Sequence, residues 1–195
     1  MSEILTIDTG SSISPTKLEE KIEPLVLYGE NFEMLNDEIP LYRDELPNFE
    51  MSNLIKRLKM TMKLYGGIGL SANQCGIYER VFVIGTDQFQ IACINPKVLE
   101  VSQEINKDNE GCLSFPGLFL KVPRPISVHA EFMDEFGETR RMWLDGITAR
   151  CYLHELDHMN GVKFTSKVGT VTMSQARRKQ SKLMKKIQRS KKDGV

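Results

Sequence analysis

Cys151-Tyr152-Leu153-His154-Glu155-Leu156-Asp157-His158-Met159-Asn160-Gly161 is the stretch of sequence around which the chain is organised. His154 and His158 are four residues apart, so a helix places both imidazoles on one face, where one metal ion can bind them both. Glu155 is rotated from them by about 100° on such a helix and can reach a water on the metal without binding the metal itself. This H-E-x-x-H pattern predicts two metal ligands and a general base.

The residues around the two histidines predict a buried helix. Apolar Ile147, Leu153 and Leu156 suit burial, and Gly161 is typical of the position just after a helix C-terminus. A lone histidine is more often structural than functional, and we interpret His129, in a predicted strand, in that way.

A catalytic metal also needs a third protein ligand and an open position for water. Cys112 is the best candidate because it lies in a loop bounded by glycine and proline, Glu110-Gly111-Cys112-Leu113-Ser114-Phe115-Pro116-Gly117. A thiolate ligand would allow Fe(II), Zn(II), Ni(II) or Co(II). Cys75 and Cys93 have no comparable setting, and Cys151, one turn before His154, is interpreted as core packing.

Composition and charge are those of an ordinary globular protein. The 195 residues predict one domain with some length left for tails, and 26 basic residues balance 26 acidic ones. The N-terminus lacks the features of a signal peptide, and no apolar run approaches the roughly 18 residues of a membrane span. We therefore expect a cytoplasmic protein with no membrane or DNA partner, whose four cysteines are thiols or ligands. A secreted protein with two disulfides is the weaker interpretation.

Apolar periodicity predicts the main elements. A stripe from Met51 to Tyr65 predicts a helix that begins after Asn48 and ends at Gly66-Gly67. Strands are predicted at residues 80–84, 90–94, 98–105, 126–132 and 138–144, with the last two forming a hairpin and Asn95-Pro96 interrupting the series.

The tail, about Thr172 to Lys192, has a helical period and nine lysine or arginine residues, opposed by Asp193 alone. Because the whole chain is neutral, residues 1–171 carry an excess of about eight negative charges. Such a basic run is either a solvated face or a surface for an anionic partner such as RNA.

Three separated motifs resemble those of one family, the peptide deformylases. Gly67-Ile68-Gly69-Leu70-Ser71-Ala72-Asn73-Gln74 resembles the first motif, Glu110-Gly111-Cys112-Leu113-Ser114 the second, and His154-Glu155-Leu156-Asp157-His158 the third. The resemblance covers about residues 25–170, with the order and spacing of the family. It implies an α+β fold, with mainly antiparallel sheets packed around a buried metal-binding helix and a basic C-terminal helix. It also implies removal of the formyl group from N-formylmethionyl nascent peptides, releasing formate.

The resemblance implies roles for individual residues. Cys112, His154 and His158 would bind one divalent metal ion, usually Fe2+ in the family and often replaced by Zn2+, Ni2+ or Co2+ in preparations. Glu155 would be the general base, and the Gln74 amide and the Leu113 backbone N–H would stabilise the oxyanion. Candidate substrate-binding positions are Ile68, Gly69, Gly111, Arg124, Ile147 and Arg150, with Ile68, Gly69 and Gly111 pairing with an extended peptide and Arg124 near the mouth of the site.

Two departures from the family pattern lie on the histidine helix. Leu153 stands where the family commonly has glutamine, and Arg150 replaces a usually apolar pocket position. We hypothesise that Arg150 borders the methionine pocket and changes the preference for the residues that follow methionine.

The predicted organisation is an N-terminal extension, loosely ordered, over residues 1–22, a catalytic domain over 23–171 and a basic helix over 172–195. The family resemblance further implies that this helix meets the ribosome. Two alternatives are a zinc metallopeptidase with a different third ligand, and a structural metal site in an RNA-binding module. Neither alternative uses all three motifs, and a structural site has no use for Glu155.

Overall fold

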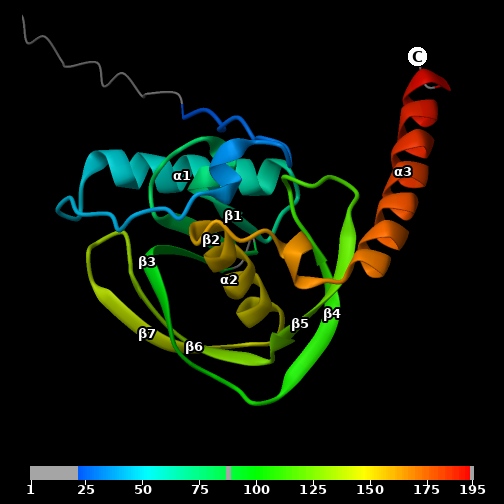
Figure 1. Cartoon of the computed structure of the whole chain (residues 1–195). Helices are drawn as coiled ribbons and strands as arrows, with labels where there is room; N and C mark the ends of the chain where they lie inside the picture. Colours follow the sequence, from blue (N-terminus) through cyan, green and yellow to red (C-terminus); the bar gives the residue numbers. More distant parts are fainter. Residues whose placement is uncertain (1–21, 87–88, 194–195) are drawn as a thin grey trace, which may run out of the picture.

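Over the residues that the structure describes, the fold combines a five-stranded antiparallel sheet, a separate two-stranded hairpin and three α-helices (Figure 1). The computed structural model describes residues 22–86 and 89–193, so the expected loosely ordered extension lies, apart from Ile22, outside the described residues. The expected α+β class with mainly antiparallel sheets is confirmed. The strands are β1 (Gly69–Ser71), β2 (Val81–Gly85), β3 (Gln90–Val101), β4 (Ile105–Gly111), β5 (Phe119–Pro125), β6 (Ser127–Met133) and β7 (Thr139–Asp145). The helices are α1 (Phe49–Leu64), α2 (Gly146–Met159) and α3 (Thr170–Asp193), with short 3-10 helices η1 (Glu33–Asn36), η2 (Ala72–Cys75) and η3 (Phe164–Lys167).

Helix α1 packs on one face of the five-stranded sheet, whose order is β1-β2-β3-β6-β7, over the end formed by β1, β2 and β3. As predicted, Asn48 caps the helix, with its Oδ1 accepting the Met51 N–H at 2.8 Å. Gly66, at φ 67°, follows the helix end in the left-handed conformation that suits glycine. The apolar stripe of α1 packs against the sheet residues Leu70, Val81, Val83, Ala92 and Ile94.

Helix α2, which carries the histidines, packs on the opposite face of the same sheet. Alternate residues of the strands point to this side, so Phe82, Ile84 and Cys93 pack with Ala149 and Tyr152 of the helix. Strand β2 is buried on both faces, which explains its continuous apolar sequence. Figure 1 shows α2 running through the middle of the molecule, enclosed by strands.

Strand β3 does not stop at Asn95-Pro96, and that expectation is wrong. The strand continues to Val101 because Asn95 adopts a positive φ of 51° and the register with β6 shifts between Ile94 and Lys97. The Asn95 side chain bonds to both the N–H and the carbonyl of Tyr42, which holds this irregular point in place.

The β4–β5 hairpin differs from the sequence-based expectation. The sequence pattern predicts a strand from 98 to 105 and a loop from 110. In the structure a separate strand, β4, runs from Ile105 to Gly111 and pairs along its length with β5. The connecting segment is therefore residues 112–118. It holds Cys112 directly beyond the end of β4.

The basic tail forms α3, which begins at Thr170, two residues before the predicted start at Thr172. Figure 1 shows α3 rising beside the β4–β5 hairpin and leaving the body of the molecule towards its C-terminal end. No helix in the described part of the chain is long and apolar enough to cross a membrane.

Candidate metal centre and active site

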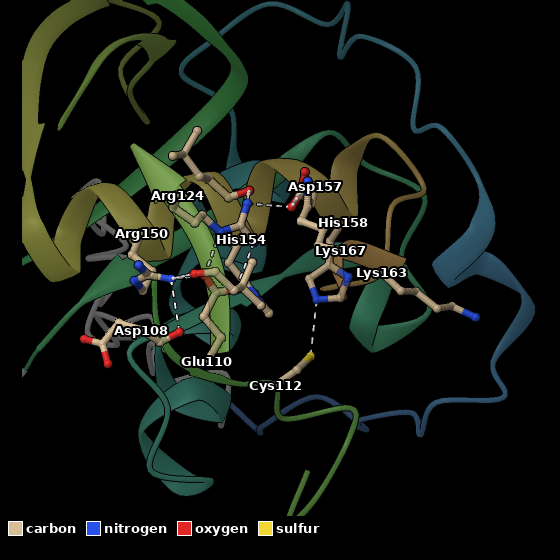
Figure 2. Close-up of polar contacts among 12 residues, drawn as sticks. Asp108, Glu110, Cys112, Arg124, Arg150, His154, Asp157, His158, Lys163 and Lys167 are labelled. Carbon is tan, nitrogen blue, oxygen red and sulfur yellow. Dashed lines mark hydrogen bonds and ion pairs between the residues drawn. The ribbon is translucent and has the colours of Figure 1, made fainter. Parts of the chain in front are cut away.

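Cys112, His154 and His158 converge, with ligand atoms that all lie within 4.8 Å of one another. Helix α2 presents both imidazoles on one face, and Cys112 reaches them from the end of β4. The Sγ of Cys112 lies 3.3 Å from Nε2 of His158. Two donors bonded to one tetrahedral ion at 2.0–2.3 Å are separated by about 3.5 Å, so this spacing fits ligands of one metal. Figure 2 shows the thiol and the His158 ring pointing toward one another.

Glu155 is buried beside these three residues with only 3% of its surface exposed. Burial raises the pKa of Glu155 to about 7, because desolvation disfavours the charged carboxylate. Among the residues that the structure describes, no partner hydrogen-bonds its Oε2 atom. A carboxyl group with such a pKa can both take up and release a proton near neutral pH.

The two histidines are held in place by contacts made away from the converging atoms. The Nδ1 of His154 lies 3.1 Å from Oε2 of Glu110, which fixes the ring and leaves Nε2 toward the cysteine side. The backbone carbonyl of His158 accepts a hydrogen bond from Nδ2 of Asn73 at 2.7 Å. Burial lowers the pKa of His158, favouring the neutral imidazole that a metal needs.

Glu110 is the centre of a buried ionic network that sequence reasoning missed (Figure 2). Arg124 donates to both of its oxygens, at 2.7 and 2.9 Å, and a third nitrogen of Arg124 donates to Asp157 at 2.7 Å. Burial alone would raise the pKa of Glu110, but the hydrogen bonds with Arg124 and His154 outweigh it and lower the pKa to about 2. Glu110 therefore remains ionised behind His154. The signal was available, because Arg124 occupies an inward position of β5 between apolar residues, where a charge requires a partner.

The structure places Arg124 away from the expected mouth of the site. It is 4% exposed, lies behind His154 and points into the network rather than toward solvent. The physical reason is the pairing with Glu110 and Asp157, which compensates a charge that burial would otherwise make costly.

Arg150 does border the cavity, but its guanidinium is engaged within the protein. Nη1 donates to Glu110 at 2.7 Å and to the Val122 carbonyl at 2.8 Å, while Nη2 donates to the Asn106 carbonyl at 2.8 Å. Arg150 thus adds a second cation to Glu110. Leu153 packs with the apolar residues around α2.

The paired glycines of the first motif allow α2 and the 112–118 segment to approach closely. A Cβ atom added to Gly69 would overlap Glu155 Oε1 and lie 2.6 Å from Sγ of Cys151. One added to Gly67 would lie 2.8 Å from Cδ1 of Leu113. A side chain at either position would force the side chains of Glu155 and Cys151, or that of Leu113, to move, so proximity rather than a positive φ favours glycine here.

Gln74 lies in η2, with its amide directed at the converging residues. Its Oε1 accepts hydrogen bonds from the N–H and the hydroxyl of Ser71, both at 3.0 Å, which sets the orientation of the amide. Its Nε2 then lies 3.3 Å from Sγ of Cys112 and 3.1 Å from Oγ of Ser114. The amide N–H groups are thus presented to the site by the rest of η2.

A cavity of about 500 Å³ opens over these groups. The predicted site residues that line this cavity are Ile68, Gly69, Gln74, Gly111, Cys112, Leu113, Ile147, Arg150, His154 and Glu155. Tyr65 and Phe119, which were not predicted, line it as well. Tyr65, Ile68, Phe119 and Ile147 are apolar or aromatic and exposed, so they give the cavity an apolar rim. The cavity therefore suits an apolar side chain attached to a group that reacts beside Glu155.

The other cysteines are separate from the converging group. Burial raises the pKa of Cys151 well above its usual value, and the Cys151 thiol donates to the Ile68 carbonyl at 3.2 Å. Burial likewise raises the pKa of Cys75 to about 12 and that of Cys93 well above its ordinary range. All four cysteines are free thiols in the structure.

The sequence and the fold both match known proteins. The family model for polypeptide deformylase matches residues 22–174. A peptide deformylase from Prochlorococcus marinus is 38% identical over 163 residues, which is 80% of this chain and 79% of that protein.

Solved structures agree with this match. The crystal structure of a peptide deformylase from Synechococcus elongatus in complex with actinonin superimposes with a TM-score of 0.75 at 31% identity, covering 92% of this chain and 94% of that one. A Met-Ala-Ser-bound peptide deformylase from Acinetobacter baumannii gives a TM-score of 0.71 at 26% identity, covering 74% and 98%. The chain belongs to the peptide deformylase family, the metal-dependent hydrolases that remove the N-formyl group from nascent polypeptides.

Proposed function

We propose that Cys112, His154 and His158 hold one divalent metal ion and that Glu155 is the general base for hydrolysis of the N-terminal formyl group. The observation that carries this proposal is the convergence of one thiol and two imidazoles within 4.8 Å, beside a buried carboxyl group. The donor set of one thiolate and two imidazoles suits Fe2+, Zn2+, Ni2+ or Co2+. Fe2+, the usual metal of the family, is the ion that we propose for the cell. When bound, such an ion lowers the pKa of water and polarises a carbonyl oxygen.

Glu155 moves the proton. With a pKa of about 7 it accepts a proton from the attacking water as the oxygen adds to the formyl carbon. It then donates that proton to the nitrogen of the departing peptide, so the products are formate and a free amine. Burial of Glu155 keeps bulk water from competing for the proton.

Gln74 and Leu113 stabilise the charge that develops on the formyl oxygen. The Gln74 amide is held by Ser71, with its Nε2 close to Cys112 and Ser114. The backbone N–H of Leu113 follows Cys112 directly in the loop that lines the cavity. Donors fixed before the reaction gain their full value in the transition state, because they need no reorganisation.

The substrate binds as an added strand. Strand β1 is the edge of the five-stranded sheet, and the cavity is lined by Gly69 of this strand and by Gly111 at the end of β4. Ile68, Ile147 and Arg150 border the same space, in which the methionine side chain and the following residues bind. Arg124 contributes through Glu110 and His154 instead of touching the peptide.

The direct test of the activity is product analysis with formyl-Met-Ala-Ser. The metal-loaded protein is expected to release formate and leave Met-Ala-Ser intact, which mass spectrometry and a formate assay distinguish. Cleavage within the tripeptide would favour the metallopeptidase alternative. Release of neither product would favour a structural metal site.

We further propose that the protein acts in the cytoplasm and docks on the ribosome through α3. Among the side chains of the helix that the structure describes, the exposed cations are Arg178, Lys179, Lys182, Lys185, Lys186 and Arg189. Phosphate groups of RNA need only such clustered positive charge. Because Ala176 is buried and Arg177 pairs with Glu30, the base of α3 packs on the body while these cations stay accessible.

Replacing Lys182, Lys185 and Lys186 together with glutamine is expected to weaken co-sedimentation with ribosomes. The slope of log affinity against log salt should become shallower by about one for each phosphate group that the variant no longer binds. The matched control replaces the exposed Lys56, Lys107 and Lys121 of the body with glutamine, which removes the same charge. Equal binding by the two triple variants would rule out docking through α3.

A further inference from the structure

The 112–118 segment has two sides, and α3 covers the one that faces away from the cavity. Residues 112–118 line the cavity except for Ser114, whose hydroxyl accepts from Gln74. Two tight turns shape the segment, with the Phe115 N–H donating to the Cys112 carbonyl at 2.9 Å and the Leu118 N–H to the Phe115 carbonyl at 3.1 Å. Figure 1 shows the first part of α3 standing beside the end of the hairpin that carries this segment.

A chain of polar contacts links α3 to the backbone of the segment. The Nε2 of Gln180 donates to the Pro116 carbonyl at 2.9 Å. The Oε1 of the same amide accepts from Nη1 of Arg177 at 2.9 Å, which determines which end of the amide faces the loop. Arg177 in turn pairs with Glu30. The donor of Gln180 is therefore oriented by a second side chain that is itself anchored on the body.

Apolar contacts reinforce this link. Gly117 adopts a φ of 74°, and a Cβ atom there would lie 3.3 Å from Sδ of Met184 and 3.4 Å from Cδ2 of Leu183. The helix thus lies directly against the backbone of the loop. Two turns earlier in α3, Ala176 is buried in the cluster that contains Phe115 and Leu118.

Cys112 is packed against that same cluster. The proposed metal ligand and the proposed oxyanion donor, Leu113, therefore lie in a segment that is fixed on one side by α3. Gly111 differs, because it belongs to β4 and pairs with Phe119 in the hairpin. The position of Gly111 is set by the strand ladder, whereas that of residues 112–118 depends on packing and on the Gln180 contact.

We infer that α3 braces the 112–118 loop for catalysis and that Gln180 is a positioning residue for it. This inference rests on the roles proposed for Cys112 and Leu113. Gln180 acts through the Pro116 carbonyl and touches neither substrate nor metal. Without its donor, the loop samples positions in which the Leu113 N–H no longer meets the developing oxyanion. Loss of the donor therefore raises the free energy of the transition state and leaves the free energy of peptide binding nearly unchanged.

The test is Gln180→Glu, which keeps the shape of the side chain and its acceptor for Arg177 but replaces the donor with an oxygen opposite the Pro116 carbonyl. The matched control is Ser181→Glu, which makes the same change in net charge on the neighbouring exposed residue. For formyl-Met-Ala-Ser, kcat is expected to fall about fivefold in Gln180→Glu, the value of one hydrogen bond, with KM little changed. Amide hydrogen exchange in peptides covering 112–118 is expected to become faster in this variant alone.

Equal kcat values for the two variants would overturn the inference, as would a loss confined to KM. Unchanged exchange in the loop of Gln180→Glu would also overturn it. A wild-type protein that releases no formate would refute the proposed function instead. The exchange comparison would then still decide whether Gln180 holds the loop.

Discussion

Replacing Glu155 with glutamine is expected to lower kcat for formate release by about 10²- to 10⁴-fold, the usual contribution of a positioned general base. Glutamine has nearly the same shape and can occupy the same buried position against Gly69. It cannot take a proton from water or return one to the leaving amine. The residual rate would come from the metal and the oxyanion donors alone.

The measurement is the rate of formate release at saturating formyl-Met-Ala-Ser, together with metal content and thermal unfolding of the same samples. Glu100→Gln is the matched control, since Glu100 is exposed on β3, at the surface of the sheet. Its rate should equal that of the wild type. A Glu155→Gln protein that retains its metal and more than about a tenth of the wild-type kcat would be inconsistent with proton transfer by Glu155.

Replacing Cys112 with alanine is expected to abolish formate release at metal concentrations that saturate the wild type. Loss of a residue that only supports a ligand weakens metal binding by about 10- to 100-fold, so loss of a direct ligand should exceed that range. His154 and His158 would remain on α2, but two imidazoles do not complete a site for a catalytic ion.

The fold of the Cys112→Ala protein should survive, because Cys112 lies outside the buried part of its apolar cluster and only packs against it. Adding the metal in large excess should restore part of the activity. This recovery would show that the thiol contributes to catalysis by increasing the affinity of the site for the ion. Formate release at the wild-type rate without added metal would contradict the assignment of Cys112 as a ligand.

The histidine helix was predictable because its information is local. A period of 3.6 residues, two histidines one turn apart and a terminal glycine are all readable within fifteen residues, and α2 indeed runs from Gly146 to Met159. The α1 helix was predictable for the same reason, since its cap and its apolar stripe are contiguous. Cys112 could be singled out through its motif, although the distance between it and α2 could not.

The features that sequence reasoning missed depend on partners far away in the chain. Arg124 alternates with apolar residues, which indicates an inward charge, but its partner Glu110 cannot be identified until β4 and β5 pair and α2 closes over them. Arg150 was expected to border the methionine pocket, and it does line the cavity, but the contacts of its guanidinium with Glu110 and backbone carbonyls could not be predicted. A charged side chain indicates polarity only, and the fold decides whether it meets water, substrate or an opposite charge.

The bulge in β3 was missed for a related reason. Asn95-Pro96 is a typical turn sequence, yet the side chain of Asn95 bonds to Tyr42 and keeps the strand in the sheet. The contact joins residues 53 positions apart. Local propensity therefore favoured a turn, and tertiary contacts determined a bulge.

The most direct test of the metal centre is the number of metal ions per chain, measured by elemental analysis of protein purified without oxygen. The wild type and Cys75→Ala, which removes a thiol that lies outside the ligand group, are predicted to hold one ion per chain. Cys112→Ala is predicted to lose it. A Cys112→Ala protein that still carries one tightly bound ion would contradict the central claim that this thiol and the two imidazoles hold the metal together.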